Sequence, residues 1–140
     1  MIKADYIVGL VDGEGSFCVQ VATKQFSPKR RARVELRFFL KLIERDLIVL
    51  KELKEFFGCG SIYFQRDKRL NHQNCYRFEV FNRTELRDVI IPFFEANPLR
   101  TVSKQRDFEI FRNILQKVWE DRHFTETGLV EIRALQMQMH

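Results

Sequence analysis

The segment Tyr6 to Phe17 reads Y-I-V-G-L-V-D-G-E-G-S-F: an apolar helical run that ends in two acids and passes directly into a strand-like pattern. Gly9 and Gly13 are four residues apart and lie on one face of a helix, where the missing side chains let a second backbone approach closely. Asp12 and Glu14 lie at the helix end, and carboxylates in such a place suit a hard divalent cation. The simpler interpretation is a helix C-terminus with glycine caps, although acids are mildly unfavourable at that end of the helix dipole.

The nine residues 7–15 resemble, position for position, the signature motif of the LAGLIDADG homing endonucleases. The sequence departs from the family motif at Glu14, where the family has aspartate, but glutamate also ligates metal ions through oxygen. The resemblance implies that the motif helices of two subunits pack together, with Gly9, Asp12 and Gly13 at the interface of a homodimer. It also implies that Glu14 is catalytic and holds a metal ion together with the carbonyl of Gly13, whereas Asp12 has a capping and interface role.

The same resemblance implies a basic residue at the active site. Residues 98–105 read P-L-R-T-V-S-K-Q and are similar to the family's turn that brings a lysine to this site. Lys104 is the first candidate and Arg100 the second, and the alternative is a solvated lysine in the first turn of a helix. The expected cofactor is Mg²⁺, with Mn²⁺ as a substitute, because such an ion neutralises transition-state charge and activates a bound water.

The length of 140 residues suits a single domain, and we expect residues 1–140 to form one domain that is half of a homodimer. A net charge of +5 and a pI of about 9.3 favour a polyanionic partner, although many basic proteins bind no nucleic acid. The three cysteines form no C-x-x-C pair, which favours a reducing, intracellular environment. The sequence shows neither an apolar run of bilayer-spanning length nor a signal-peptide pattern, so no membrane partner is expected.

Alternating apolar and polar residues predict two β-hairpins. Residues 16–24 and 33–42 form the first hairpin, with a basic connecting loop, and residues 61–65 and 76–81 form the second. Between the hairpins, the spacing of apolar residues predicts a helix over 46–57, capped by its first residue.

Further helices are expected after the second hairpin, the first capped by Thr84 and a longer one by Ser103. Thr125 or Thr127 begins the last helix, and the apolar stripe that includes Trp119 is expected in the core. The order α-β-β-α-β-β-α with extra C-terminal helices is that of the family's single-motif subunit. The resemblance therefore implies an α+β fold whose saddle-shaped, four-stranded antiparallel sheet places its concave face on DNA.

One face of the predicted sheet carries mixed polar side chains that suit base edges in a DNA groove. Arginine and glutamine can pair with guanine and adenine, and glutamate can accept from cytosine. Any solvated sheet face alternates in this way, so the assignment depends on the motif as well as on the alternation. The predicted DNA-binding residues, including basic residues of the two hairpin loops, are Ser16, Cys18, Gln20, Lys24, Lys29, Arg30, Arg31, Arg33, Glu35, Arg37, Phe39, Tyr63, Gln65, Arg66, Arg77 and Glu79.

Together, these expectations predict a site-specific, divalent-metal-dependent DNA endonuclease of the intron-encoded homing type. Such an enzyme makes a double-strand break at a long target site. Two alternatives use the same fold without cutting DNA: an RNA maturase that binds intron RNA, and a non-cleaving nucleic-acid-binding protein. The three histidines have no zinc-like spacing and no Gly-rich phosphate loop is present, so neither a zinc site nor nucleotide hydrolysis is supported.

Overall fold

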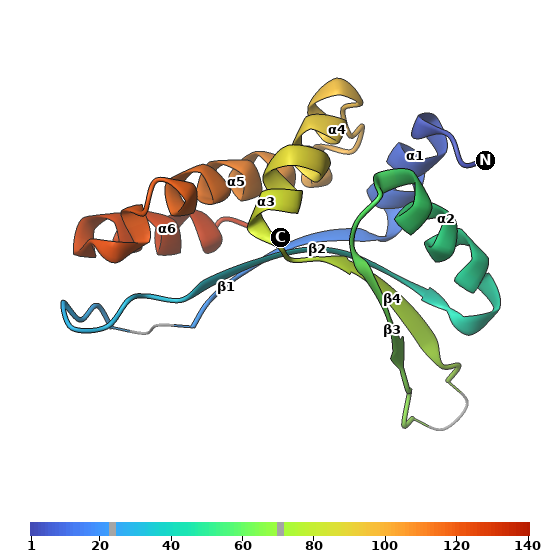
Figure 1. Cartoon of the computed structure of the whole chain (residues 1–140), viewed down its shortest axis with the longest axis horizontal. Coiled ribbons are helices and arrows are strands. Elements are labelled where there is room, and N and C mark those ends of the chain that lie inside the picture. The colour runs from blue at the N-terminus through green and yellow to red at the C-terminus, as the bar shows by residue number, and fades with distance from the viewer. Residues whose placement is uncertain (23–24, 70–71) are drawn as a thin grey trace.

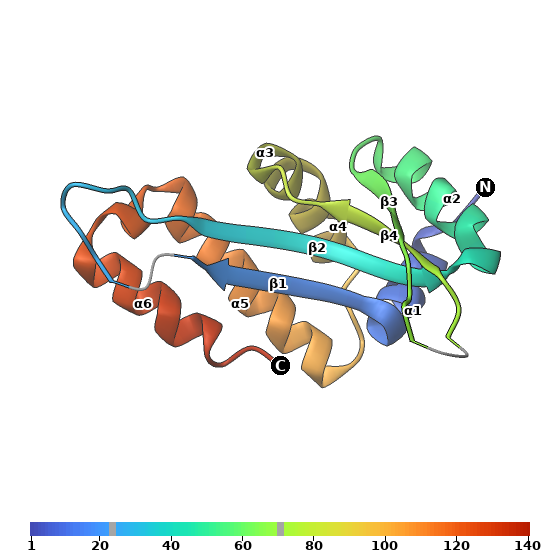
Figure 2. The ribbon, with the colours of Figure 1, turned by 90° about the horizontal axis from the view of Figure 1, so that it is seen from below.

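The computed structural model describes residues 1–22, 25–69 and 72–140, and a curved antiparallel sheet of four strands forms its centre (Figure 1). The strands lie in the order β1-β2-β4-β3, and their bounds are β1 (Gly15–Val21), β2 (Val34–Ile43), β3 (Ser61–Gln65) and β4 (Cys75–Val80). The helices lie over one face, and the sheet arches beneath them so that its other face is concave and uncovered (Figures 1 and 2). The predicted α+β fold with a four-stranded saddle is confirmed.

The helices follow the predicted order. They are α1 (Ala4–Glu14), α2 (Leu47–Phe57), α3 (Arg83–Glu85), α4 (Ile91–Ala96), α5 (Val102–Trp119) and α6 (Glu126–Gln136), with the short turns η1 (Glu44–Asp46), η2 (Leu86–Ile90) and η3 (Arg122–Phe124). The η2 turn is π-helical and precedes Pro92, whose missing N–H cannot continue the regular hydrogen-bond pattern, so the helix adjusts there and continues into α4. None of the described helices is both long and apolar enough to cross a bilayer.

Phenylalanine rings fill the interface between the sheet and the helices. Phe17 of β1 and Phe38 of β2 are fully buried, with ring centroids 5.2 Å apart. Phe17 also meets Phe94 of α4 at 5.7 Å and Phe111 of α5 at 5.3 Å. Because strand residues alternate between faces, this packing directs the residues between them to the concave side. Truncating one such buried ring typically lowers the free energy of unfolding by about 3–5 kcal/mol. The packed rings therefore hold the strands, and with them the concave face, in a fixed arrangement.

One predicted helix cap is wrong and another is confirmed. Asn82, and not Thr84, caps α3, because its side-chain oxygen accepts a 3.1 Å hydrogen bond from the Glu85 amide. Thr125 caps α6 by accepting a 3.0 Å hydrogen bond from the Gly128 amide. Both residues stand directly before their helices, where a short polar side chain can reach an unpaired amide of the first turn.

Three further expectations differ from the structure. Ser103 lies inside the first turn of α5, because that helix begins at Val102. Asp46 forms no side-chain cap at the start of α2, since η1 leads directly into that helix. Trp119 is 40% exposed instead of being part of the core, and the Arg87 guanidinium stacks on its ring at 3.7 Å.

Candidate functional site

The C-terminal end of α1 is joined to the N-terminal end of α5 through Asp12. One oxygen of its carboxylate accepts hydrogen bonds from the Thr101 amide (3.1 Å) and hydroxyl (3.0 Å), and the other accepts one from the Arg100 amide (3.0 Å). Although partial burial opposes the effect, these bonds and the charge of Lys104 hold the pKa of Asp12 below its usual value. Asp12 therefore caps α5, and the positive end of that helix offsets the unfavourable position of an acid at the end of α1.

Glu14, the last residue of α1, has a different environment. Its side chain is exposed, and no residue of the described ranges forms a hydrogen bond or an ion pair with its carboxylate. The turn that follows is tight, because a Cβ placed on Gly15 would lie 2.6 Å from Cγ1 of Val11. Glycine thus fixes how the chain leaves α1 for β1. Glu14 stands at this fixed junction with its carboxylate available to an external group.

Gly9 and Gly13 lie on an uncovered face of α1. Both are exposed, and apart from its chain neighbours and the local backbone of α1, a Cβ built on either would find no described atom within 4 Å. Tyr6, about one turn earlier, is 53% exposed. A second helix can therefore approach this face closely, as the predicted interface requires. The third predicted interface residue, Asp12, already uses its carboxylate within the subunit.

Both basic candidates lie at the same junction. Lys104 is half-buried in the first turn of α5, where its charge acts on Asp12. Arg100 gives its backbone amide to Asp12, and its side chain is exposed. In the part of the chain that the structure describes, no three Asp, Glu, His or Cys side chains form a metal cluster. Mg²⁺ commonly takes one or two carboxylates with waters and substrate phosphates, and an exposed Glu14 fits such an open site.

Strand pairing brings the predicted DNA-binding residues of the strands together on the concave face. Ser16 of β1, Phe39 of β2, Glu79 of β4 and Ser61 of β3 stand in one row across the whole sheet. The other paired positions on this face are Cys18 with Arg37, Gln20 with Glu35, Lys41 with Arg77, Arg77 with Tyr63, and Cys75 with Gln65.

The concave face also contains residues that the sequence prediction omits, namely Lys41, Ser61 and Cys75. The alternation that places Phe39 on this face applies equally to Lys41, so the signal for that residue was present. The predicted loop residues lie outside the paired strands; those described are exposed, and they are Lys29, Arg30, Arg31 and Arg66. Lys24 lies outside the described residues.

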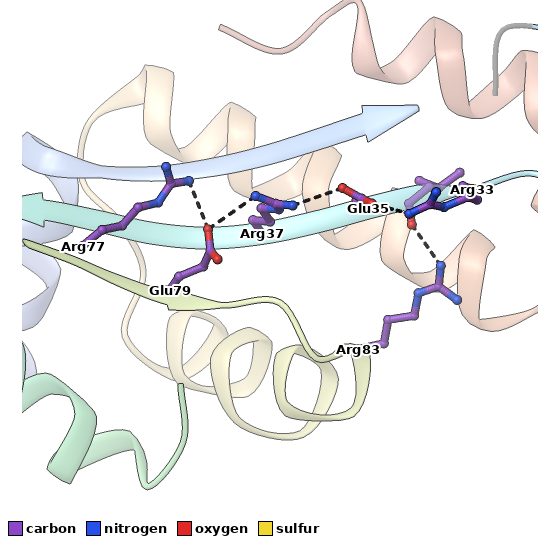
Figure 3. A network of polar contacts seen from close by, with 7 residues as sticks. Arg33, Glu35, Arg37, Arg77, Glu79 and Arg83 are labelled. Atoms are coloured by element: carbon purple, nitrogen blue, oxygen red, sulfur yellow. Dashed lines mark hydrogen bonds and ion pairs between the residues drawn. The ribbon is translucent and has the colours of Figure 1, made fainter. Parts of the chain in front are cut away.

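Alternating arginines and glutamates form a network on the concave face (Figure 3). The Glu35 carboxylate lies 3.1 Å from both Arg33 and Arg37. The Glu79 carboxylate lies 3.8 Å from Arg37 and 3.1 Å from Arg77. We refer to these five residues as the arginine–glutamate network.

The network changes the roles expected for its two acids. The sequence predicts Glu35 and Glu79 as acceptors for cytosine, but each carboxylate lies between two guanidinium groups, and Glu79 is only 8% exposed. Arg77 is held further by the ring of Phe39, 3.5 Å from its guanidinium carbon. Partly exposed ion pairs contribute only about 0–1 kcal/mol to stability, so the main effect of the acids is to orient the arginines.

Residues 7–115 match the sequence profile of the family described as LAGLIDADG endonuclease. The chain belongs to the LAGLIDADG endonuclease family. It is 34% identical over 132 residues to the probable intron-encoded endonuclease 2 of Neurospora crassa, and the alignment covers 94% of this chain and 28% of that protein. It is 32% identical over 111 residues to homing endonuclease I-ApeII of Aeropyrum pernix, with 79% and 60% covered. This LAGLIDADG chain thus spans little more than a quarter of the Neurospora relative.

Solved structures of homing endonucleases share the whole fold. I-TnaI aligns with a TM-score of 0.83 and 36% identity over 99% of this chain and 88% of its own. I-SmaMI, bound to uncleaved DNA target in the presence of calcium ions, aligns with a TM-score of 0.85 and 29% identity over 100% of this chain and 45% of its own. The LAGLIDADG motif of this chain, residues 7–15, therefore lies where α1 meets β1 in the family's fold.

Proposed function

We propose that this LAGLIDADG protein is a site-specific homing endonuclease that cuts both strands of a long DNA target with a divalent metal ion. The observation that carries the proposal is the exposed Glu14 carboxylate, held at the junction where α1 passes into a concave, arginine-rich sheet. The relatives named as endonucleases and the I-SmaMI complex with DNA and calcium support the same substrate and a metal ion.

The proposed enzyme is a homodimer in which the α1 helices of two copies pack together. One chain offers one Glu14, whereas a double-strand break needs a cut in each strand, and a two-fold axis supplies the second carboxylate. The open surface at Gly9 and Gly13 allows this approach. The chain covers 45% of I-SmaMI, so that protein has room for a second unit of this size.

In the proposed dimer, Glu14 and the carbonyl of Gly13 would hold Mg²⁺, or Mn²⁺ in its place; such an ion would supply an activated water and neutralise charge at phosphorus. Lys104 stabilises the developing negative charge at the scissile phosphate. We place it ahead of Arg100 because it is half-buried beside Asp12, which limits the positions that its ammonium can occupy.

The sheet sets the length of the proposed target. β2 has 10 residues and follows the long direction of the concave face (Figure 2). At ~3.3 Å per residue and ~3.4 Å per base-pair step, it spans about ten base pairs. Two saddles related by a two-fold axis then cover a target of about 18–22 base pairs.

Selection of cleaved sequences from a randomised DNA library in Mg²⁺ tests the proposal, with Glu14→Gln protein as the matched control. We expect one discrete cut site of the stated length from the parent protein and none from the variant. Recovery of bound but uncut DNA would instead support a non-cleaving binding protein, and preference for intron RNA over any DNA would support a maturase.

A further inference from the structure

A pocket lies at the free edge of β2, beside the concave face. β4 ends at Val80, which pairs with Phe38, so the first residues of β2 extend beyond their partner strand. Arg83 covers part of this edge, because its guanidinium donates a 2.9 Å hydrogen bond to the Val34 carbonyl (Figure 3). The cavity has a volume of about 280 Å³, and its polar and aromatic lining is Arg31, Arg33, Glu35, Arg83, His123 and Phe124.

Positive charge dominates this pocket. The Arg31 guanidinium lies 4.9 Å from the centroid of the Phe124 ring, and Arg83 is anchored to the backbone of β2. Glu35 is the one acid in the described lining, and two arginines already bind its carboxylate at 3.1 Å each. Planar guanidinium groups held in this way suit the oxygens of a phosphate.

His123 is the buried member of the pocket. Its side chain is 1% exposed, its ring lies 4.0 Å from that of Phe124, and no residue in the described ranges bonds to its Nδ1. Burial, and then the charges of Arg83 and Arg31, lower the pKa of His123, so its imidazole is neutral at pH 7. A neutral imidazole has one N–H donor, and buried polar nitrogens are normally hydrogen-bonded. In the tautomer that protonates Nδ1, this unpartnered nitrogen can donate a hydrogen bond, and the arginines of the pocket favour an anion as its acceptor.

We propose that this pocket binds one phosphate of the DNA backbone on the outer flank of the target, with Arg31 and Arg83 supplying charge and His123 a hydrogen bond. The DNA backbone is the phosphate source that the geometry favours, because Arg33 and Glu35 belong both to the pocket and to the arginine–glutamate network. A duplex that lies on the network is thus brought to the pocket. The inference rests on the proposed function for its ligand and adds Arg83 and His123 to the DNA-binding residues.

The pocket is first tested without DNA by titrating inorganic phosphate into the protein at constant ionic strength and following the His123 imidazole by NMR. We expect a saturable shift in the parent, and its loss in Arg83→Gln. Arg122→Gln is the matched control, because Arg122 is in the same turn as His123, pairs with Glu120 and does not line the pocket. A His123 signal that does not respond to phosphate overturns the proposal.

The second test neutralises single DNA phosphates as methylphosphonates along both flanks of a bound duplex. At one outer position, the parent and Arg122→Gln should lose affinity by about tenfold, the loss expected for one charge-assisted contact. His123→Phe and Arg83→Gln should bind unmodified DNA more weakly and lose nothing further at that position. Arg83→Gln should also flatten the slope of log K against log salt by ~0.9. If Arg83→Gln does not fold, Arg31→Gln replaces it with the same expectations, because Arg31 is an exposed arginine of the same pocket.

The outcomes separate this inference from the proposed function. If the parent cuts its target but no flanking methylphosphonate distinguishes it from the variants, the pocket does not bind DNA and the inference is wrong. The coupling tested here is a methylphosphonate effect that the parent shows and the variants lack. If the pocket binds inorganic phosphate but this coupling is absent, the inference is also wrong, because the site then binds a free anion. Weaker binding of intron RNA, but not of DNA, by the variants assigns the pocket to RNA and overturns it as well. If the coupling appears in a protein that cuts no DNA, the pocket stands and the proposed endonuclease does not.

Discussion

The Asp12 carboxylate accepts hydrogen bonds from both the amide and the hydroxyl of Thr101, which lies 89 residues later in the chain. This contact fixes the end of α1 against the start of α5. Glu14, two residues after Asp12, has no partner in the described ranges and stays open to ligands. The two acids of the motif thus have separate structural roles, one holding the junction and the other presented by it.

Asp12→Asn should lower the free energy of unfolding by about 1 kcal/mol at pH 7, the usual effect of weakening a helix cap. The pKa of Asp12 is lowered in the folded state, so its contribution is present above the unfolded value of 3.8 and is lost as the pH falls through the folded pKa. Urea unfolding of parent and variant at neutral and strongly acidic pH measures the difference. A gap between the two proteins that persists in strong acid contradicts this account.

Gly9→Leu should separate the dimer without unfolding the subunit. Within one chain a Cβ at this position meets no described atom beyond its chain neighbours and the local backbone of α1, so the subunit tolerates the side chain, whereas a helix packed closely against it does not. Overpacking of roughly 1–3 kcal/mol weakens association by up to about a hundredfold. Analytical ultracentrifugation over a dilution series measures the change, and circular dichroism checks the fold. A variant that dimerises as tightly as the parent excludes this face as the interface.

The fold and the concave face were largely predictable because their signals are local. Alternation along residues 16–21 and 34–42 determines which side chains face the helices, and register then brings Ser16, Phe39 and Glu79 together. The open face formed by Gly9 and Gly13 was also predictable, because their spacing along one helix does not depend on tertiary contacts. Predictions of this kind depend only on the period of a strand or a helix.

What could not be predicted depends on contacts between distant segments. The resemblance implies a capping role for Asp12, but its partner Thr101 lies 89 residues later, and nothing near either residue indicates that they meet. The role of Glu79 follows from a strand pairing that places its carboxylate between Arg37 and Arg77. Trp119 has the spacing of a core residue, yet no element covers it fully and Arg87 stacks on its ring.

Glu79→Gln should reduce sequence discrimination more than affinity. The substitution releases Arg37 and Arg77 from a shared carboxylate, so both can still contact phosphates but no longer hold one orientation toward bases. Discrimination against single base substitutions should fall by about tenfold, within the ~1–3 kcal/mol of one good base contact. Binding assays on a set of singly substituted targets measure this ratio. The control is Glu95→Gln, which makes the same charge change at the ion pair between Glu95 of α4 and Arg112 of α5. This variant should leave the discrimination ratio unchanged.

His123 should make the protein less stable in mild acid. Burial, opposed by Asp121 but reinforced by Arg83 and Arg31, holds the pKa of His123 below 6.5 in the folded state. As the pH falls below 6.5 the unfolded chain takes up a proton that the folded chain resists, so the free energy of unfolding decreases until the folded pKa is reached. Urea unfolding from about pH 7.5 to 5 should show this decrease in the parent. The part of the slope due to His123 should vanish in His123→Phe, and an unchanged slope in that variant contradicts the assignment.

Glu14→Gln should slow metal-dependent cleavage by orders of magnitude while folding, dimerisation and DNA binding persist. The amide keeps the shape of the side chain but lacks the charge that holds a divalent ion, and loss of one such transition-state contact reduces the rate by roughly a hundredfold or more. In the proposed dimer the substitution removes the Glu14 carboxylate of both copies, and these carboxylates repel the DNA phosphates. DNA binding should therefore be as tight as in the parent or tighter. Glu14→Asp, which restores the family's residue, should retain activity. The comparison requires single-turnover cleavage in Mg²⁺ and binding in parallel, with Asp12→Asn as the neighbouring acid that acts through stability. Cleavage by Glu14→Gln at the parent rate would show that this carboxylate does not hold the metal.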